Sequence, residues 1–466
     1  MNLHSIRTVY FVGIKGVAMA ALAIYCKERG MNVRGCDTEE KFPTDEELRK
    51  TKVPVDIGFD SMLLAKKTDL VIYTGAHGGR DNPVVRFAFD RGIPTLSHGK
   101  ALGMFMEGKR QITVVGSHGK TTTAGMIATT LKVKGKDPSY AIGCGALLGM
   151  GPAGHFGSGD FFVAEGDEYV TDHGHDETPR FLWQKPEVMV ATNIDFDHPD
   201  AYPTLKSVQD AFVGLQKQQV GQKLTVVNID DPKSKVLLSG QNVITYGFSP
   251  RADMHITHIG VGVGRMFFTL EQKRVRAGEF TLKVPGRHNV ANAVAAIVTC
   301  QALGLNIDEI HNGLLAFSGT KRRFEKLGEV EGVTYYDDYA HHPAEIIATL
   351  AGAKKWYPHR RIIAVFQPHT FSRTKALLPD FARAFTDAAM VILTDIYASA
   401  REHDTLGTEG KTLLEETLKH HGDVRYGKDF LEVRKILSEK IMPGDVVIFM
   451  GAGDIYTWGR KIVYSA

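Results

Sequence analysis

Short apolar runs that end in glycine or polar residues recur along the chain, and three of them open a strand-turn-helix pattern. The first is TVYFVGIKGVAMAALAIYCKERG (8–30), in which an apolar strand, a glycine turn and a helix of small residues end at Gly30. The second is QITVVGSHGKTTTAGMIATTLK (111–132), and a third block opens with VTYYDDY (333–339). Strands that alternate with helical patterns predict parallel, doubly wound sheets covered by helices.

Further apolar runs extend each block in the way that buried parallel strands do. They are VRGCD (33–37), DLVIYTGA (69–76), FFVAEG (161–166), VMVATNI (188–194), KLTVVNID (223–230), RIIAVFQP (361–368), AMVILTDIY (389–397) and DVVIFMGAG (445–453). The prediction is an α/β protein of three domains, at residues 1–105, 106–318 and 319–466. The segment 249–285 alternates and carries glycine, so it is predicted to form an antiparallel flap on the middle domain.

The composition mainly argues against certain classes of protein. Charged residues are scattered and the formal net charge is +3, so the basic surface of a nucleic-acid binder is not expected. Cys26, Cys36, Cys144 and Cys300 stand far apart, which predicts separately packed, reduced thiols. No apolar run reaches the about 18 residues that cross a bilayer, and the chain enters its first strand without a charged-then-apolar leader. We therefore expect a cytoplasmic protein that binds neither nucleic acid nor membrane.

The stretch VVGSHGKTTT (114–123) has the features of a phosphate-binding loop. Its glycines let backbone N–H groups approach an anion, and the following helix adds its positive end. Lys120 can reach the outer phosphates, and the hydroxyl of Thr121 or Thr122 can bind Mg²⁺. Val114 stands where a standard Walker loop has its first glycine, so this loop is shorter. The alternative is a tight strand-to-helix turn with a solvated lysine.

Two groups of acidic and polar side chains follow strands that come after this loop. They are Glu165, Asp167 and Glu168 in FFVAEGDEY, and Asn193, Asp195, Asp197 and His198 in VMVATNIDFDH. The carboxyl ends of parallel strands line the ligand crevice of an open sheet, and Mg²⁺ prefers carboxylates together with substrate phosphates. At least one of these side chains is therefore predicted to bind Mg²⁺, although each one alone also fits an exposed turn.

The stretch DHGHDE (172–177) offers His173 and His175 at a spacing that a strand could use for zinc. Its composition is that of a loop, and no third ligand stands at a familiar spacing. A polar loop at the rim of the site is the preferred interpretation.

Five further motifs complete an ordered set. They are GRHNVANAVAAI (286–297), KRRFE (321–325), DDYAHHPAEI (337–346), QPHTFSRT (367–374) and MGAGDIY (450–456). With FVGIKG, GSHGKTTT and TNIDFDHPDAY, they resemble the Mur ligase family over nearly the whole chain. The resemblance implies Rossmann-like first and third domains and a central domain of the P-loop ATPase type. It is strongest to the branch that joins L-alanine to the lactyl carboxylate of UDP-N-acetylmuramate, releasing ADP and phosphate, in peptidoglycan synthesis.

The same resemblance implies ATP and Mg²⁺ as cofactors, and a monomer or a homodimer. It places the UDP diphosphate at Gly13, Ile14, Lys15 and Gly16. It implies ATP contacts from Gly116, Ser117, His118, Gly119, Lys120, Thr121, Thr122, His288, Asn289, Asn292, Arg323 and Asp338. It implies metal ligands at Thr121, Glu165 and His198. The residues expected around the reacting carboxylate and the incoming amino acid are Lys120, His341, His369 and Arg373.

Individual motifs keep simpler interpretations. Pro343 could open a helix without any chemistry, and Asn289 and Asn292 could be capping or surface residues. Arg322 and Arg323 could be solvated. Among the histidines, His341 and His342 are the candidates for accepting the proton of the attacking amine.

Three other functions are weighed against this reading. A murein tripeptide ligase would attach a preformed tripeptide to the same nucleotide sugar, but QPHTFSRT and MGAGDIY favour the alanine-adding branch. A Rossmann oxidoreductase is suggested by FVGIKG and Asp37, but Lys15 occupies the second glycine of the dinucleotide fingerprint. A nucleotide-binding protein that senses a UDP-sugar without turnover would not need Lys120.

Overall fold

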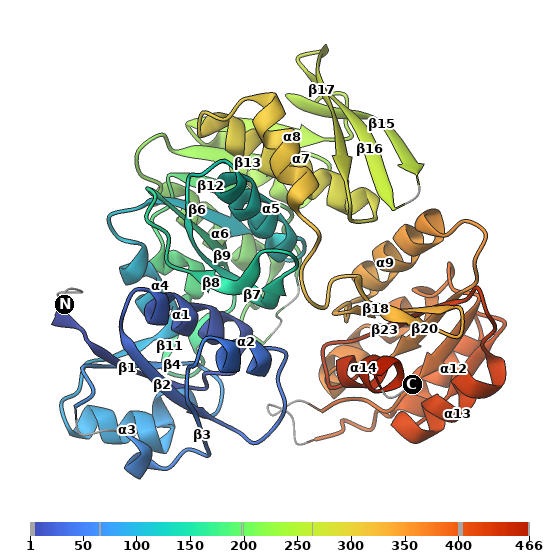
Figure 1. The fold of residues 1–466 in the computed structure, drawn as a ribbon, viewed down its shortest axis with the longest axis horizontal. Helices are drawn as coiled ribbons and strands as arrows, with labels where there is room; N and C mark the ends of the chain where they lie inside the picture. The colour runs from blue at the N-terminus through green and yellow to red at the C-terminus, as the bar shows by residue number, and fades with distance from the viewer. Residues whose placement is uncertain are drawn as a thin grey trace. The chain divides into compact units, whose positions relative to one another are not determined.

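The computed structural model describes residues 5–64, 67–196, 198, 200–262, 264–398 and 404–464. Their strands form three main sheets and one two-stranded sheet (Figure 1), which confirms the predicted α/β class. The chain divides into two compact units, one of residues 1–259, 267–282 and 289–320, the other of residues 260–266, 283–288 and 321–466. The predicted boundary near residue 319 lies beside this division, whereas the one near residue 106 lies inside the first unit and stays a prediction.

The N-terminal sheet is parallel, with the strand order β3-β2-β1-β4-β5. Its strands are β1 (Thr8–Val12), β2 (Asn32–Asp37), β3 (Val55–Ile57), β4 (Leu70–Tyr73) and β5 (Thr95–Ser97). Its helices are α1 (Val17–Glu28), α2 (Asp45–Lys50), α3 (Pro83–Asp90) and α4 (His98–Met106). The order reverses between β1 and β4, so the loops after these two strands flank the crevice where open α/β sheets bind ligands.

The central sheet has ten strands in the order β17-β16-β15-β14-β13-β12-β6-β9-β7-β8. They are β6 (Arg110–Val115), β7 (Ser139–Leu147), β8 (Gly151–His155), β9 (Phe161–Gly166), β12 (Val188–Ala191), β13 (Leu224–Asn228), β14 (Asn242–Gly247), β15 (Met254–Gly262), β16 (Arg265–Gln272) and β17 (Val275–Leu282). The accompanying helices are α5 (Lys120–Val133), α6 (Leu205–Lys217), α7 (Arg287–Ala302) and α8 (Ile307–Ala316). Strands β15 to β17 account for the predicted flap, and they extend the sheet beyond β14.

The C-terminal sheet has the order β18-β19-β23-β20-β21-β22, parallel except for β18, which pairs antiparallel with β19. Its strands are β18 (Glu325–Val330), β19 (Val333–Asp338), β20 (Ile362–Phe366), β21 (Met390–Leu393), β22 (Val424–Tyr426) and β23 (Val446–Met450). Its helices are α9 (Pro343–Trp356), α10 (Phe371–Ala376), α11 (Leu378–Arg383), α12 (Gly410–Leu418), α13 (Phe430–Lys440) and α14 (Tyr456–Tyr464).

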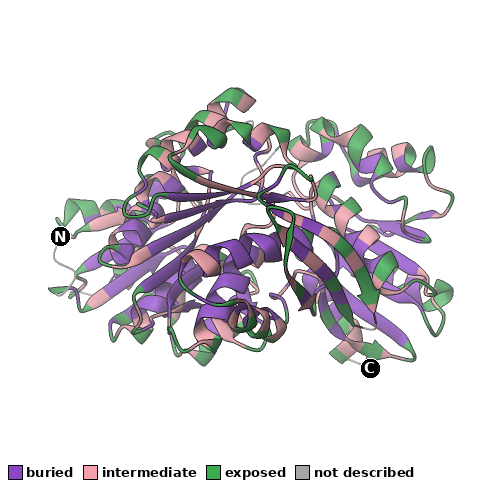
Figure 2. Cartoon of the chain, turned by 90° about the horizontal axis from the view of Figure 1, so that it is seen from above, coloured by how far each residue is buried: buried purple, intermediate pink, exposed green. Residues whose placement is uncertain are grey.

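Strand side chains alternate between two cores in this C-terminal sheet. Ala364 and Phe366 of β20 pack in one apolar cluster, while Ile363 and Val365 pack in the other. A strand covered on both faces must be apolar at every position, which is why IIAVF is unbroken. Figure 2 shows the same arrangement along the chain, with buried strands and exposed residues on outer helix faces and loops.

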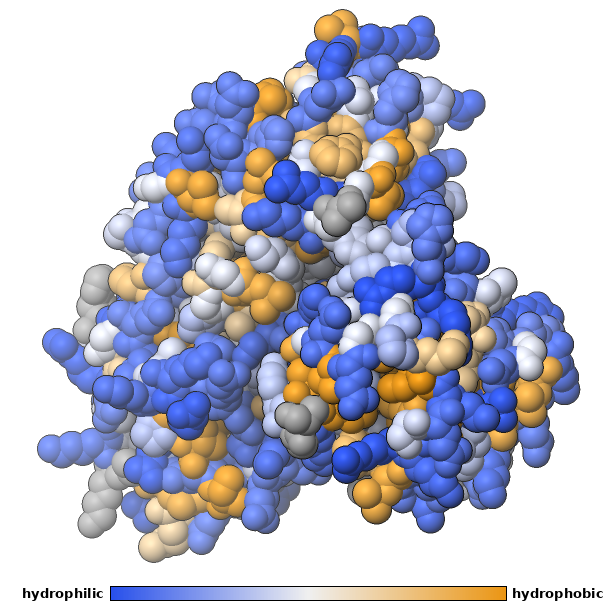
Figure 3. Space-filling model, turned by 45° about the vertical axis from the view of Figure 1, so that its right-hand side comes forward, coloured by the Kyte–Doolittle hydropathy of each residue, from blue (hydrophilic) through white to orange (hydrophobic). Residues whose placement is uncertain are grey.

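The surface is mainly hydrophilic on the side that Figure 3 shows. The apolar side chains of this face lie in separate patches. Within the described part of the chain, no helix combines the length and the apolar character needed to cross a bilayer. All four cysteines lie in the described part, are buried and form no disulfide with one another.

One histidine links α1 to the central sheet. His155 Nδ1 lies 2.6 Å from Glu28 Oε2, and His155 Nε2 lies 3.0 Å from Asp137 Oδ1. The Phe156 N–H also donates to Glu28 Oε2 at 3.0 Å. The hydrogen bond to Glu28 raises the pKa of His155, and the bond from His155 lowers the pKa of Asp137 to about 2. The two carboxylates therefore favour the protonated form of the ring that lies between them. We call these three side chains the His155 clasp.

The stability that His155 contributes is expected to depend on pH. Because its pKa is raised on folding, its contribution is full below about pH 6.5 and is lost as the pH rises through the raised value. Because the pKa of Asp137 is lowered, the stability that its charge contributes is lost only under strongly acidic conditions. We expect His155→Gln to reduce the free energy of unfolding by about 1 kcal/mol at mildly acidic pH, since the clasp is partly exposed, and by less at alkaline pH. Urea unfolding of both proteins across that range measures this, and a loss that grows with pH would contradict it.

Candidate functional site

The turn after β6 has the backbone that a phosphate loop needs. Gly116 and Gly119 have φ values of 137° and 84°, a region that side chains with a Cβ rarely enter. A Cβ at Gly116 would lie 2.1 Å from Thr192 Oγ1, and one at Gly119 would lie 2.6 Å from Asn292 Oδ1. Helix α5 begins immediately afterwards at Lys120, so its first N–H groups follow the turn.

The turn is fastened to the segment that follows β12. The His118 N–H donates to Asn193 Oδ1 at 2.9 Å, and Asn193 Nδ2 donates back to the His118 carbonyl at 3.0 Å. The Asp195 N–H donates to Ser117 Oγ at 2.8 Å. The sequence offers Asn193 and Asp195 as candidate Mg²⁺ ligands. In the structure, the side chain of Asn193 and the backbone of Asp195 bind the phosphate loop. The His118 ring, with Nε2 3.8 Å from Asp195 Oδ2, and a hydrogen bond from Lys233 keep the pKa of Asp195 well below its usual range.

Lys120 has a buried acidic partner. Its Nζ lies 2.9 Å from Oε2 of Glu168, whose side chain is only 4% exposed. Burial alone would lower the pKa of Lys120, but the negative charges of Glu168 and Asp167 outweigh it and raise the pKa. The ammonium therefore stays charged in the loop. Glu168 is the third acidic residue of FFVAEGDEY, and the sequence pattern did not show which of the three acids would pair with Lys120.

Thr121 and Glu165 meet as predicted for a metal site. Thr121 Oγ1 donates to Glu165 Oε1 at 2.7 Å, because β6 and β9 are neighbours in the sheet. A hydroxyl and a carboxylate in contact are oxygen donors of the type that suits Mg²⁺. Among the described residues, no three His, Cys, Asp or Glu side chains gather as a metal site by themselves. The pair therefore fits an ion that takes its other ligands from a nucleotide and water.

His198 lies close to Glu168 and to Tyr169. Its Nε2 lies 3.9 Å from Glu168 Oε1, and its ring makes an edge contact with Tyr169 at 5.1 Å. Asp197, another candidate in the same motif, lies outside the described residues. Glu168 thus lies between the phosphate-loop lysine and the histidine that the resemblance assigns to a second metal ion.

The two asparagines of α7 are buried rather than surface caps. Asn292 Nδ2 donates to Asn289 Oδ1 at 3.2 Å, and the residues are 6% and 9% exposed. Asn292 also borders Gly119 of the phosphate loop. The alternative that these residues only cap or cover the helix is therefore wrong, although an adenine contact stays a prediction.

Several predicted groups of the C-terminal domain lie close together. The rings of His341 and His369 are 6.2 Å apart, and His369 stacks on Tyr397 at 5.7 Å. Arg373 follows His369 within the first turn of α10. Tyr397, which no motif indicated, is therefore part of the same group. His342 accepts a hydrogen bond from the Ala344 N–H at the start of α9.

The predicted nucleotide contacts His288, at the start of α7, and Arg323 and Asp338 of the C-terminal domain belong to one compact unit. Burial, followed by the positive charge of Arg323, lowers the pKa of His288 to about 4, so its imidazole is neutral at pH 7. Burial raises the pKa of Asp338 to about 6 against the opposing charge of Arg323. Arg323 itself is partly exposed and lies 3.4 Å from Glu345. Arg322 is 5% exposed, so the alternative that it is solvated is wrong.

In the first domain, the Lys15 side chain is held by hydrogen bonds to backbone carbonyls. Its Nζ donates to the carbonyls of Thr38 and Glu40, each at 2.8 Å, and its side chain is 7% exposed. Asp37, which suggested an oxidoreductase, is 1% exposed and accepts the N–H groups of Lys15 and Thr38. An acid held in this way is not presented to a ribose, which weakens the oxidoreductase hypothesis. Gly13 makes the turn with φ 81°.

The hairpin of β10 (Val170–Asp172) and β11 (Asp176–Pro179) holds the two histidines that could have bound zinc. His175 Nε2 lies 2.8 Å from Asp81 Oδ2 of the first domain, whereas His173 lies beside Glu177. The preferred interpretation of a polar rim loop agrees with these contacts.

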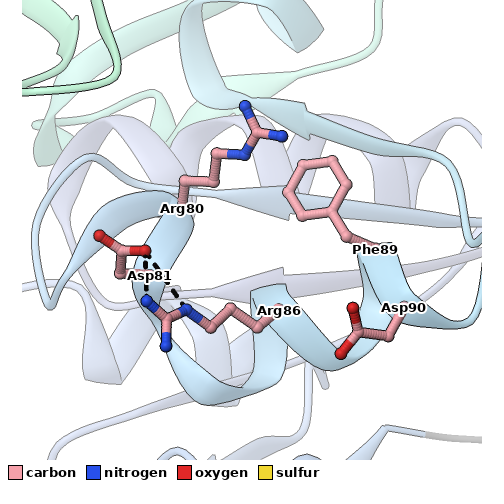
Figure 4. A pocket seen from close by; sticks show the side chains of 5 residues that line it. All are labelled: Arg80, Asp81, Arg86, Phe89 and Asp90. Atoms are coloured by element: carbon pink, nitrogen blue, oxygen red, sulfur yellow. Dashed lines mark hydrogen bonds and ion pairs between the residues drawn. The ribbon is translucent and has the colours of Figure 1, made fainter.

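A surface hollow of about 270 Å³ lies next to Asp81 (Figure 4). Arg80, Asp81, Arg86, Phe89 and Asp90 line it, and none belongs to the glycine turn at residues 13–16. The Arg80 guanidinium covers the Phe89 ring at 4.8 Å, and Arg86 pairs with Asp81 at 2.7 Å. Two of its four charged side chains, Asp81 and Arg86, therefore pair with each other.

Comparison with known proteins identifies the family. Residues 8–110 match the profile "Mur ligase family, catalytic domain", residues 157–300 match "Mur ligase middle domain", and residues 322–453 match "Mur ligase, glutamate ligase domain". The chain belongs to the Mur ligase family. The resemblance found in the motifs is confirmed, and so is the three-domain α/β architecture that it implied.

The curated relatives of this Mur ligase match it from end to end. It is 38% identical to the UDP-N-acetylmuramate–L-alanine ligase of Desulfitobacterium hafniense, over 99% of this chain and 100% of the relative. It is 37% identical to the ligase of the same name from Caldanaerobacter subterraneus, over 99% and 98%.

Two solved structures share the fold of this Mur ligase. The UDP-N-acetylmuramate-alanine ligase of Thermotoga maritima matches with a TM-score of 0.84 and 27% identity, over 98% of each chain. A murein peptide ligase from Psychrobacter arcticus matches with a TM-score of 0.74 and 23% identity, also over 98% of each chain. At 23% identity, the match to the Psychrobacter arcticus protein supports the fold alone.

Proposed function

We propose that this Mur ligase uses ATP to join L-alanine to UDP-N-acetylmuramate, releasing ADP and phosphate. The support is the full-length similarity to ligases of that name, together with one geometric observation. Lys120 and Thr121 open α5 directly after the glycine turn, with Glu168 and Glu165 in contact with them. A phosphate cradle with a charged lysine beside an oxygen-donor pair suits phosphoryl transfer.

A carboxylate is a poor electrophile for an amine, so the reaction first phosphorylates the lactyl carboxylate. One carboxylate oxygen attacks the terminal phosphorus of ATP, the bond from that phosphorus to the ADP oxygen breaks, and an acyl phosphate forms. Lys120 and the N–H groups of the turn would offset the repulsion between these anions. Mg²⁺, held by Thr121 and Glu165 with His198 near a second ion, would add positive charge to the phosphate oxygens.

The amine of L-alanine then attacks the acyl carbon, and phosphate leaves. The amine must lose a proton, and a neutral imidazole can accept it. We assign this step to His341, because His341 and His369 lie together whereas His342 is used at the start of α9. Arg373, near His369, is a candidate to bind the carboxylate of the amino acid. Lys120 would also stabilise the oxyanion of the tetrahedral intermediate.

The test is substrate-dependent phosphate release. Purified protein with ATP, Mg²⁺ and UDP-N-acetylmuramate is expected to release phosphate only after L-alanine is added. A parallel reaction receives L-Ala-D-Glu-meso-diaminopimelate in place of L-alanine. Release with the tripeptide alone would assign the chain to the tripeptide-adding activity, and equal release without any acceptor would reject the ligase.

A further inference from the structure

Two residues of the segment 321–325 have left-handed backbone conformations. The φ values are 63° at Arg322 and 50° at Phe324, and neither residue is a glycine. Such conformations cost free energy and persist where the surroundings impose them, often at functional sites. Arg323 stands between the two, with its side chain 33% exposed and near Glu345. The segment therefore buries one arginine and presents the next.

Three hydrogen bonds to the backbone of this segment stabilise the conformation, two of them with side-chain carboxylates as acceptors. The Arg322 N–H donates to Glu325 Oε2 at 2.9 Å, and the Phe324 N–H donates to Asp338 Oδ2 at 2.8 Å. The Tyr339 N–H donates to the Arg322 carbonyl at 2.6 Å. Two of these bonds tie the segment to the end of β19, at Asp338, and to Tyr339 directly after it.

The guanidinium of Arg322 joins this segment to a second strand end. Its Nη2 donates to the Gly451 carbonyl at 2.6 Å and lies 3.4 Å from the Gly453 carbonyl. The guanidinium carbon lies 4.9 Å from the ring centre of Tyr339 and 4.6 Å from that of Tyr456. A planar group that stacks on aromatic rings and donates in its own plane is specific to arginine, because lysine offers only a point charge.

Two residues that the Arg322 side chain contacts, Tyr339 and Gly453, lie next to the group of predicted catalytic histidines. The Tyr339 ring contacts the His341 ring at 5.0 Å, and the Tyr339 carbonyl lies 3.0 Å from His341 Nδ1. On the other side, a Cβ at Gly453 would lie only 2.6 Å from Tyr397, which stacks on His369. The loops concerned follow the carboxyl ends of neighbouring strands β19, β23 and β20, where open α/β sheets bind ligands.

We propose that Arg322 is a positioning residue of the C-terminal domain, which fixes Arg323 for the nucleotide and fixes His341 and His369 for the amino acid. It acts through the backbone of its own segment, through Tyr339 and through the turn at Gly451 and Gly453. The inference rests on the proposed ligase function, because it assumes that these three side chains meet ATP and L-alanine.

Arg360 provides a matched control in the same domain. Its Nη2 donates to the Asp445 carbonyl at 2.8 Å and to Thr334 Oγ1 at 2.9 Å, and its guanidinium carbon lies 4.9 Å from the Tyr357 ring. It therefore shares with Arg322 the donation to a backbone carbonyl and the contact with an aromatic ring, but it binds the start of β23 rather than its end. Arg322 is more deeply buried and additionally lies beside a buried acid, with its Nε 3.5 Å from Asp337 Oδ2. Losing it should lower stability without disturbing the loops at the carboxyl ends of the strands.

The experiment compares Arg322→Lys, Arg322→Met and Arg360→Met by steady-state kinetics and thermal unfolding. Both Arg322 variants are expected to raise the KM values of ATP and L-alanine by about tenfold, while the KM of UDP-N-acetylmuramate stays within about twofold. Arg360→Met should lower the unfolding temperature and leave all three KM values unchanged. Tyr456→Leu should reproduce the Arg322 effect in part, and Tyr456→Phe should not, since it keeps the ring.

Folded Arg322 variants with unchanged KM values for ATP and L-alanine would overturn the inference. So would an equal rise in all three KM values, or the same rise in Arg360→Met, because both indicate general damage. If Arg322→Met does not fold, the Tyr456 pair decides, and equal kinetics for its two members would count against the proposal. Failure of the ligase function itself would show in the wild-type protein, as phosphate release that does not respond to L-alanine.

Discussion

Replacing Lys120 with methionine is expected to lower kcat by about a thousandfold, because one charge serves both chemical steps. The ammonium would bind the phosphates during formation of the acyl phosphate and stabilise the oxyanion during amide formation. Methionine keeps the unbranched stem and removes the ammonium group, with its charge and its hydrogen bonds. Phosphate release measured at saturating ATP, UDP-N-acetylmuramate and L-alanine gives kcat directly.

The variant also removes the partner of buried Glu168, so folding must be checked beside activity. Lys217→Met, at the exposed C-terminal end of α6, is the matched control and should keep wild-type kcat and stability. A Lys120→Met protein that unfolds at the wild-type temperature and still turns over at more than about a tenth of the wild-type rate would contradict the mechanism. Retained function in cells would revive the sensor hypothesis.

Glu165→Gln is expected to lower kcat by about a hundredfold and to raise the Mg²⁺ concentration needed for half-maximal rate. The amide keeps the size of the side chain and loses the negative charge that favours a divalent cation. Its single oxygen can accept from Thr121, as Oε1 does in Glu165, but its NH2 group then replaces the oxygen that accepts from the Gly143 N–H. The thermal stability of the variant is therefore measured beside its activity.

Metal binding can be measured apart from turnover. Mn²⁺ titrated into wild-type protein with a non-hydrolysable ATP analogue should bind more tightly than in Glu165→Gln, as followed by electron paramagnetic resonance. Asp210→Asn, on an exposed position of α6, is the control and should behave like the wild type. Equal Mn²⁺ affinity in wild type and Glu165→Gln would show that this carboxylate does not hold the metal.

Local patterns were enough to predict the elements that carry the phosphate loop. An unbroken apolar run, a glycine pair and a helix start are contiguous in VVGSHGKTTT, and β6 and α5 have close to the predicted bounds. The rule that the carboxyl ends of parallel strands line the ligand crevice predicted only that at least one of the acidic side chains there binds Mg²⁺. The choice of Thr121 together with Glu165, which are in contact, came from the resemblance to the Mur ligases. The polar rim loop at His173 and His175 could also be predicted, since loop composition outweighed their spacing.

Other features depend on partners distant in the chain and could not be predicted. Glu168 is 48 residues from Lys120, and Gly451 is 129 residues from Arg322. Arg322 and Arg323 are adjacent charged residues with the same propensities, and only the tertiary fold decides which one is buried. The order of strands in each sheet is likewise set by packing between distant segments.

The central claim is that ATP activates the sugar acid as an acyl phosphate, the step for which the glycine turn after β6 would hold the nucleotide. Labelling the lactyl carboxylate of UDP-N-acetylmuramate with heavy oxygen tests this most directly, with phosphorus NMR of the phosphate released after L-alanine is added. The account predicts that each released phosphate carries one oxygen from the labelled carboxylate. Unlabelled phosphate, released together with ligated product, would contradict it.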